Sequence, residues 1–363
     1  MKKTKNIAFW FGTEAEVIKS FPVILELRKN GVNPFIISTG QNDLSSSDIV
    51  KDFDLKPDII INPFKAKKIP AYLLVWFGLT FLKGIFVFTK FKIKNNIKYV
   101  VVHGDTVSTL MGALIGKICG AKVLHLEAGL RSHNLLNPFP EEIDRIITGR
   151  LASVHFYQNE EAGQNLKTHS GEKIFTHGNV VYDAVDTFKN GDSLILESLG
   201  KDFSIITFHR AENVLSQANL KKLVEILNRS AEKNKVLFVL FDFTKIYLEK
   251  LNLLQDILNN KNIIVTPRLP YREFCVLMSK CKYIITDGGS NQEELTHLGV
   301  PTLVMRMVTE RSDGIGKNII ISKFDDKIIK SFLDNSESLR NEGEEQNSPS
   351  KIVCDRLLKY VKN

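Results

Sequence analysis

The sequence predicts an α/β protein built from two doubly wound parallel-sheet domains. Short apolar runs alternate with helical stretches, and several runs lack polar positions, as strands covered on both faces do. The chain has 363 residues, a length typical of about two domains. The alternation begins again near residue 180 with different residues. We therefore expect one domain over 1–180 and a second over 181–363, whose last helix, over 351–362, packs back toward the first domain.

The composition is typical of a globular cytoplasmic protein. Hydrophobic residues make up 43% of the chain and charged residues 25%. The cysteines form neither a CxxC pair nor a metal-binding spacing, which predicts reduced thiols and no metal site. They are Cys119, Cys275, Cys281 and Cys354. The formal net charge of +8 suits a phosphate-bearing ligand or an anionic membrane, but recognition motifs for nucleic acid are absent, so we expect no nucleic-acid partner.

The first apolar run, 7–11, predicts the first strand. It is shorter than the ~7–15 residues of a signal-peptide core, although basic residues precede it. Residues 12–19 then form a strand-to-helix turn without the GxGxxG fingerprint of dinucleotide binding. We therefore expect neither NAD nor any other cofactor. The next strand is expected over 34–38.

The stretch after residue 98 places two carboxylates at the ends of neighbouring strands. The apolar run 99–102 stops just before Asp105, and the run 123–126 stops at Glu127. A helix is expected between them over 107–119, with Asp105 or Thr106 as its N-cap. Ligands bind open α/β sheets at the carboxyl ends of their strands. Asp105 and Glu127 are therefore candidate site residues.

A third carboxylate, Glu141, opens the next predicted helix. In the first turn of that helix it can lean toward the same strand ends, and Arg145 lies one turn later on the same face. We expect Arg145 to orient Glu141. Clustered carboxylates push their pKa values apart, so we also expect one of the three to hold a proton.

The segment 71–91 is the most apolar part of the chain. Its length would admit a membrane-spanning helix, but it lies between two strands of one sheet and carries an internal lysine, Lys83. Two interpretations stay open. The segment is either a mostly buried helix of the first domain or a peripheral membrane contact at the inner face of the cell membrane, with its lysines on anionic lipid.

The second domain is predicted to repeat the strand and helix layout. Its strands are expected over 204–208, 236–241, 263–265, 283–285 and 302–305. The first ends at His209, and the fourth leads to the turn Gly288-Gly289-Ser290 at the start of a helix. Such a turn presents free backbone N–H groups to phosphate.

Seven sequence blocks, in their order and spacing, carry a resemblance to a known family. They are GDT (104–106), HLEAGLR (125–131), PFPEEIDR (138–145), TGRLA (148–152), HRAEN (209–213), TDGGSNQEE (286–294) and TER (309–311). Together they resemble the UDP-N-acetylglucosamine 2-epimerase family. The resemblance implies a glycosyltransferase-B-like fold, with two Rossmann-like domains facing across a cleft. It also implies a UDP-N-acetylhexosamine 2-epimerase of bacterial surface polysaccharide precursor synthesis, and a homodimer is one expected assembly.

The resemblance assigns roles to individual residues. The family eliminates UDP across C1–C2 of the sugar to give a glycal, and then adds UDP back. The implied catalytic residues are Asp105, Glu127, Glu141, Arg145 and His209, the last at the departing phosphate. The implied substrate-binding residues are Lys19, Gly288, Gly289, Ser290, Glu294 at the ribose and Arg311 at the phosphate.

Three departures from the family pattern keep alternatives open. Glu14 stands where the family has an arginine that contacts the nucleotide sugar. The positions of the activator site read Gln41-Asn42 and Asp242-Phe243-Thr244 in place of the family's residues. Three classes therefore stay open. The chain is an epimerase that is unregulated or hydrolysing, or a glycosyltransferase that passes the sugar to a lipid-linked acceptor near 71–91. The third class is a catalytically inactive sugar-nucleotide sensor.

Overall fold

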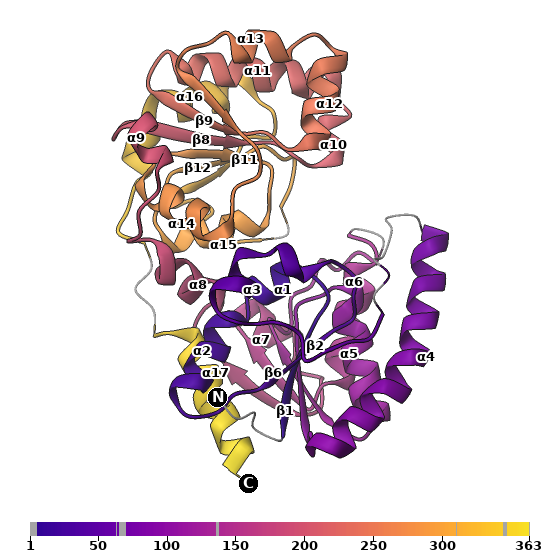
Figure 1. The fold of residues 1–363 in the computed structure, drawn as a ribbon. Helices are drawn as coiled ribbons and strands as arrows, with labels where there is room; N and C mark the ends of the chain where they lie inside the picture. Colours follow the sequence, from indigo (N-terminus) through magenta and orange to yellow (C-terminus); the bar gives the residue numbers. More distant parts are fainter. Residues whose placement is uncertain are drawn as a thin grey trace. The chain divides into compact units, whose positions relative to one another are not determined.

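The computed structural model describes residues 6–62, 64, 70–135, 138–309, 311–343 and 347–362. The chain forms two compact units (Figure 1). Unit 1 comprises Met1–Ala184 and Gln346–Asn363, and unit 2 comprises Val185–Glu345. The division between the two units thus falls inside helix α8 (Val181–Phe188), and the C-terminal segment is grouped with unit 1.

Unit 1 contains a seven-stranded parallel sheet in the order β3-β2-β1-β4-β5-β6-β7. Its strands are β1 (Ile7–Phe11), β2 (Phe35–Ser38), β3 (Ile59–Ile60), β4 (Tyr99–His103), β5 (Lys122–Leu126), β6 (Val154–Tyr157) and β7 (Glu172–Phe175). Its helices are α1 (Glu14–Ile18), α2 (Phe21–Lys29), α3 (Asp48–Asp52), α4 (Pro70–Asn95), α5 (Val107–Ile118), α6 (Glu141–Leu151), α7 (Glu160–Asn165) and α17 (Pro349–Lys362). The central strands β1 and β4 are buried along their whole length, as expected of strands covered on both faces.

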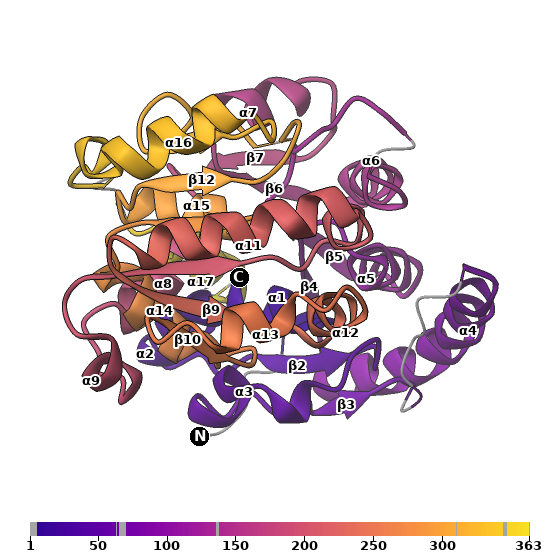
Figure 2. The same ribbon diagram turned by 90° about the horizontal axis from the view of Figure 1, so that it is seen from above.

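Helices α4, α5 and α6 pack side by side, and α17 packs against α2 (Figures 1 and 2). Gly112 of α5 allows this helix to lie close to the sheet, because a Cβ there would lie 2.6 Å from the Trp10 ring. The N-cap of α5 is Thr106, whose Oγ1 accepts the backbone N–H of Thr109 (3.1 Å). Asp105 is therefore not used as a cap, and its carboxylate is available to other groups.

Unit 2 contains a six-stranded parallel sheet in the order β10-β9-β8-β11-β12-β13. Its strands are β8 (Phe203–Thr207), β9 (Lys235–Val239), β10 (Ile263–Thr266), β11 (Ile284–Thr286), β12 (Thr302–Val304) and β13 (Ile319–Ile321). Its helices are α9 (Ile195–Leu199), α10 (Ala211–Val214), α11 (Gln217–Ala231), α12 (Asp242–Lys250), α13 (Leu254–Leu258), α14 (Tyr271–Lys280), α15 (Ser290–His297) and α16 (Asp326–Asn335). Two parallel-sheet α/β domains are the predicted fold class, which the structure confirms.

Among the described residues, no helix has both the length and the apolar character needed to cross a membrane.

Candidate active site

Glu127 lies at the carboxyl end of β5 in an unusual backbone conformation. Its φ of 59° is in the left-handed region, which costs a residue other than glycine roughly 1–3 kcal/mol. Its side chain is only 5% exposed, and Oε2 receives Lys19 Nζ (2.6 Å) and Asn179 Nδ2 (3.1 Å). His103 Nε2 lies 3.8 Å from the same oxygen. Strain held in place by several partners at a strand end is typical of a functional residue.

Asp105, at the end of β4, is paired with Arg145 of α6. Arg145 Nε donates to Asp105 Oδ2 (2.8 Å), and Nη2 lies 2.5 Å from the same oxygen. Arg145 Nη1 also lies 3.4 Å from Glu142 Oε2. The guanidinium thus links the β4 loop to the first turn of α6.

Arg145 was expected to orient Glu141, but the structure does not pair these two residues. Arg145 is directed to Asp105 and Glu142, while Oε2 of Glu141 is buried with no hydrogen-bond partner among the described residues. The reason is the inward position of Glu142, three residues before Arg145, together with the nearby Asp105 loop. Spacing on one helix could not reveal the competing partner on another element.

Glu142 is the anchor of the loop that precedes α6. Its carboxylate is fully buried and receives Arg131 Nε (2.6 Å) and the Ser132 N–H (2.9 Å). Burial opposes ionisation, but the Ser132 N–H and the charges of Arg131 and Arg145 outweigh it and lower the pKa of Glu142. This ionised carboxylate fixes the loop next to Glu141.

Asp144 was not singled out from the sequence, yet it is the carboxyl group of this cluster whose pKa is strongly raised. Burial, followed by the negative charges of Asp105 and Glu141, raises the pKa of Asp144 to about 8. Its Oδ2 is buried without a hydrogen-bond partner among the described residues. Its place in the PFPEEIDR block, one turn after Glu141, was the available signal.

The β1–α1 turn is tied to the start of α5 through Glu16. This buried carboxylate accepts the Gly12 N–H (2.8 Å), the Thr13 N–H (2.6 Å), Thr106 Oγ1 (2.8 Å) and Thr109 Oγ1 (2.9 Å). Burial raises the pKa of Glu16. The network places Lys19, one turn later on the chain, where its ammonium group reaches Glu127. Glu14 lies half-buried in the first turn of α1.

In unit 2, His209 follows β8 and is held by Asp287, which follows β11. The backbone N–H of His209 donates to Asp287 Oδ1 (3.0 Å), and the imidazole Nδ1 lies 3.3 Å from that oxygen. The ring stacks on Phe241, with centroids 4.7 Å apart. Burial lowers the pKa of His209, whereas Asp287 acts to raise it. The ring is thus oriented by a buried carboxylate, which the sequence alone did not identify.

The turn 288–290 lies beside His209 at the start of α15. A Cβ on Gly288 would lie 3.0 Å from His209 Cε1, so glycine allows the turn to approach the imidazole. Gly289 is the N-cap of α15, which begins at Ser290. The side chain of Ser290 lies outside the described residues. Free N–H groups at such a helix start suit a phosphate.

Glu294 and Arg311 have protein partners in unit 2. Glu294 Oε1 accepts Tyr271 Oη (2.9 Å), and Oε2 accepts Asn291 Nδ2 (3.1 Å). Arg311 forms an ion pair with the buried Glu293. Tyr271 and Asn291 bind Glu294 and are therefore two further candidate site residues, which the sequence alone did not identify.

The candidate site residues of each unit lie in segments that follow the carboxyl ends of its strands. Unit 1 holds Lys19, Asp105, Glu127, Glu141 and Arg145, and unit 2 holds His209, Gly288, Gly289, Glu294 and Arg311. No group of three or more His, Cys, Asp or Glu side chains suited to a metal occurs among the described residues.

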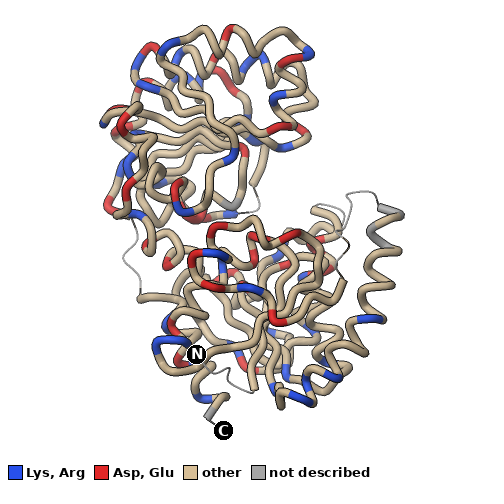
Figure 3. Tube along the Cα trace, in the orientation of Figure 1, with Lys and Arg blue, Asp and Glu red and all other residues tan. Residues whose placement is uncertain are grey.

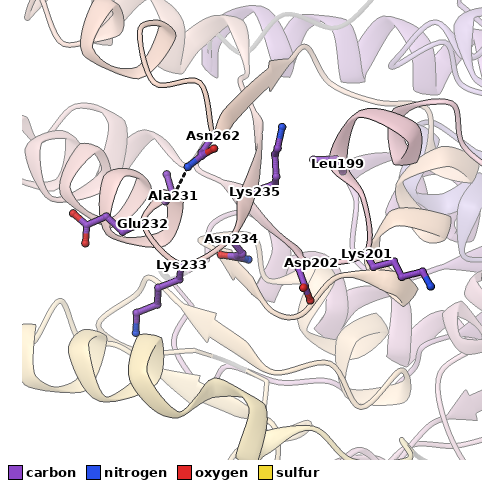
Figure 4. A pocket seen from close by; sticks show the side chains of 9 residues that line it. All are labelled: Leu199, Lys201, Asp202, Ala231, Glu232, Lys233, Asn234, Lys235 and Asn262. Atoms are coloured by element: carbon purple, nitrogen blue, oxygen red, sulfur yellow. Dashed lines mark hydrogen bonds between the residues drawn. The ribbon is translucent and has the colours of Figure 1, made fainter.

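A cavity of about 410 Å³ in unit 2 lies away from these residues (Figure 4). It lies at the amino ends of the strands, where β8 and β9 begin, and its lining includes Asp202, Lys235 and Asn262. Lys233 at its rim donates to the Leu333 carbonyl (2.8 Å) and pairs with Asp334. The cavity holds none of the proposed catalytic residues.

Comparisons with known proteins show the family of this chain. A family model described as UDP-N-acetylglucosamine 2-epimerase matches residues 25–351. The UDP-N-acetylglucosamine 2-epimerase of Campylobacter jejuni is 32% identical over 98% of this chain and 97% of its own length. That of Bacillus subtilis is 32% identical over 87% of this chain and 82% of its own.

Solved structures show the same fold. The UDP-GlcNAc 2-epimerase of Methanocaldococcus jannaschii has a TM-score of 0.82 at 28% identity, covering 98% of this chain and 99% of that one. Its complex with UDP-GlcNAc and UDP has a TM-score of 0.79 at 29% identity, with the same coverage. The spinosyn forosaminyltransferase SpnP, at 15% identity and a TM-score of 0.58, shares the fold alone. Because the family model spans most of its length, the chain belongs to the UDP-N-acetylglucosamine 2-epimerase family.

Proposed function

We propose that this chain is a UDP-N-acetylhexosamine 2-epimerase that eliminates UDP and adds it back, in the synthesis of bacterial surface polysaccharide precursors. The observation that carries the proposal is the carboxylate cluster at the ends of β4 and β5, in a chain that aligns with epimerases over almost its full length. The glycosyltransferase alternative is not favoured, because its match rests on the fold alone.

The reaction needs a base, an acid and a place for the departing charge. In the elimination, a carboxylate takes the C2 proton, a C1–C2 double bond forms, and the C1–O electron pair leaves with the phosphate of UDP. In the addition, UDP re-forms its bond to C1, and a proton is delivered to C2 on the face opposite to the one that lost it, so that C2 alone is inverted. Asp105 and Glu127, each in an ion pair, are the carboxylates that we assign to the C2 proton, with Glu141 beside them. Asp144 holds its proton at neutral pH and so limits the negative charge of the cluster.

We assign the nucleotide to unit 2. The turn 288–290 would hold the diphosphate, Glu294 the ribose hydroxyls and Arg311 a phosphate, while His209 would donate a hydrogen bond or a proton to the departing phosphate. The orientation of His209 by Asp287 supports this role. The solved complex of the Methanocaldococcus jannaschii relative contains UDP-GlcNAc and UDP, which supports a UDP-sugar as the substrate of this chain.

UDP is expected to stabilise the protein against unfolding. A ligand at ~100 times its dissociation constant adds about 2.7 kcal/mol to the free energy of unfolding when it binds only the folded state. A thermal-shift titration with UDP measures this, and cytidine diphosphate at the same concentrations is the control. Unchanged melting temperatures at saturating UDP would refute the nucleotide site.

Glu14→Arg is expected to raise activity with UDP-GlcNAc. Glu14 places a negative charge in the first turn of α1, at the position where the family carries an arginine. An anion near a diphosphate repels it, whereas an arginine binds it. Steady-state kinetics of Glu14→Arg and Glu14→Gln separate the gain of a cation from the loss of the anion. Equal kcat/KM values for all three proteins would show that position 14 does not meet the substrate.

The cellular setting is also part of the proposal. The four cysteines are free in the structure, which supports a cytoplasmic location. The homodimer stays a prediction, which sedimentation velocity would check.

A further inference from the structure

Helix α4 has an apolar outer face that the rest of the described chain leaves uncovered. Its exposed residues recur at spacings of three, four and seven, so they form one stripe along the helix. These side chains are between 58% and 74% exposed: Val75, Leu79, Leu82, Phe86 and Ile93. A continuous exposed apolar stripe of this kind marks a contact surface.

The inner face of α4 packs against the rest of unit 1. The helix therefore already buries one apolar face, and the exposed stripe lies on the other. Trp76 and Phe88 are buried, and the Phe88 ring meets Trp10 edge-on at 5.5 Å. A Cβ on Gly84 would lie 2.5 Å from Ile115 Cδ1, so glycine allows close approach to α5. The two earlier interpretations of 71–91 thus apply to different faces: the inner face is core, and the outer face needs a partner.

The charges on α4 have one sign. Residues 70–95 contain four lysines and no aspartate or glutamate. Lys83, Lys90 and Lys94 are exposed and lie along one side of the stripe, and Figure 3 shows blue positions without red ones along the described part of α4. A partner that covers the stripe must therefore tolerate or attract several ammonium groups.

We propose that the outer face of α4 docks on an anionic lipid surface, with the apolar stripe among the acyl chains and the lysines at the headgroups. An interfacial helix combines an apolar face with flanking lysines in this manner. A second copy of the chain fits less well, because two α4 helices side by side would bring lysines together without any acidic residue on the helix to pair with them. Anionic lipid satisfies both the stripe and the charges.

The proposal predicts that the full chain sediments with vesicles of phosphatidylglycerol and phosphatidylcholine but not with vesicles of phosphatidylcholine alone. Raising the salt should release it, because the Debye length falls from ~10 Å at 0.1 M to ~3 Å at 1 M. Replacing Lys83, Lys90 and Lys94 by Glu should weaken partitioning by about 100-fold or more, which corresponds to roughly 1 kcal/mol for each lysine near an anionic surface.

Two further variants make the test specific. Leu82→Ser with Phe86→Ser removes apolar area and should weaken binding while it leaves all lysines in place. Exchange of three exposed lysines of unit 2, Lys221, Lys261 and Lys327, for Glu gives the same net charge and should leave binding almost unchanged. Thermal unfolding with and without UDP shows that each variant is folded.

Three outcomes would overturn the proposal. Equal sedimentation with neutral and anionic vesicles would show that the lysines of α4 do not contribute to binding. An equal loss of vesicle binding in the unit 2 control variant would show that only the net charge of the protein matters. A dimer in solution that Leu82→Ser with Phe86→Ser converts to a monomer, without vesicle binding by the parent, would assign the stripe to a second copy. Because these readouts need no turnover, they stand or fall separately from the epimerase proposal.

Discussion

Asp105→Asn is expected to slow exchange of the C2 proton of a UDP-N-acetylhexosamine for deuterium by about 10²-fold or more, the usual contribution of a general acid or base. The amide keeps the shape of the side chain but removes the negative charge that Arg145 meets and the group that takes the proton. Glu127→Gln should have a comparable effect, because it removes the carboxylate that Lys19 and Asn179 hold. NMR of the C2 position during incubation in D2O measures the exchange rate.

The control is Glu161→Gln, the same chemical change on an exposed residue of α7 in the same unit. It should exchange deuterium at the parental rate. His209→Ala should also slow exchange by about 10²-fold if the imidazole assists the departing phosphate. A glycosyltransferase leaves C2 untouched, so it would show no deuterium at C2 and would release UDP only with an acceptor. Absence of exchange with every UDP-N-acetylhexosamine that binds would contradict the epimerase proposal.

The central strands of both sheets could be predicted because they are covered on both faces. The run 7–11 matches β1, and the run expected over 204–208 overlaps β8, since such strands consist almost wholly of apolar residues. The edge strands of unit 1, β3 and β7, lack that pattern. β3 has two residues, and β7 begins with Glu172 and Lys173, so neither was predicted from the sequence.

The candidate site was predictable only where chemistry follows from a local pattern. Carboxylates at the ends of β4 and β5 follow from strand order and the rule for α/β sheets. The pairing of Arg145 with Asp105 does not, because it joins residues 40 positions apart on different elements. Asn179 at Glu127 and Asp287 at His209 likewise depend on loop positions that spacing along the chain leaves undetermined.

Asp144 gives the second large expected effect, on stability. Its pKa is raised from 3.8 to about 8 by burial and by the charges of Asp105 and Glu141. Below about pH 4 the group is protonated in both the folded and unfolded states. Between about pH 4 and pH 8 the unfolded chain releases the proton and the folded chain keeps it. The free energy of unfolding therefore falls by up to about 1.4 kcal/mol per pH unit in this window and reaches its full loss above pH 8.

Asp144→Asn should remove this loss, because an amide keeps the polar volume and cannot ionise. The variant and the parent should have similar free energies of unfolding near pH 4, and the variant should be more stable by roughly 2–5 kcal/mol above pH 8. Urea unfolding followed by circular dichroism at a series of pH values measures the difference, and Asp192→Asn on the surface controls for the loss of one negative charge. A difference that stays constant from pH 4 to pH 9 would show that Asp144 ionises at its ordinary pKa. A difference that grows with pH would mean that the carboxyl next to Asp105 and Glu141 carries its proton at neutral pH, which is the state that the proposed mechanism assigns to it.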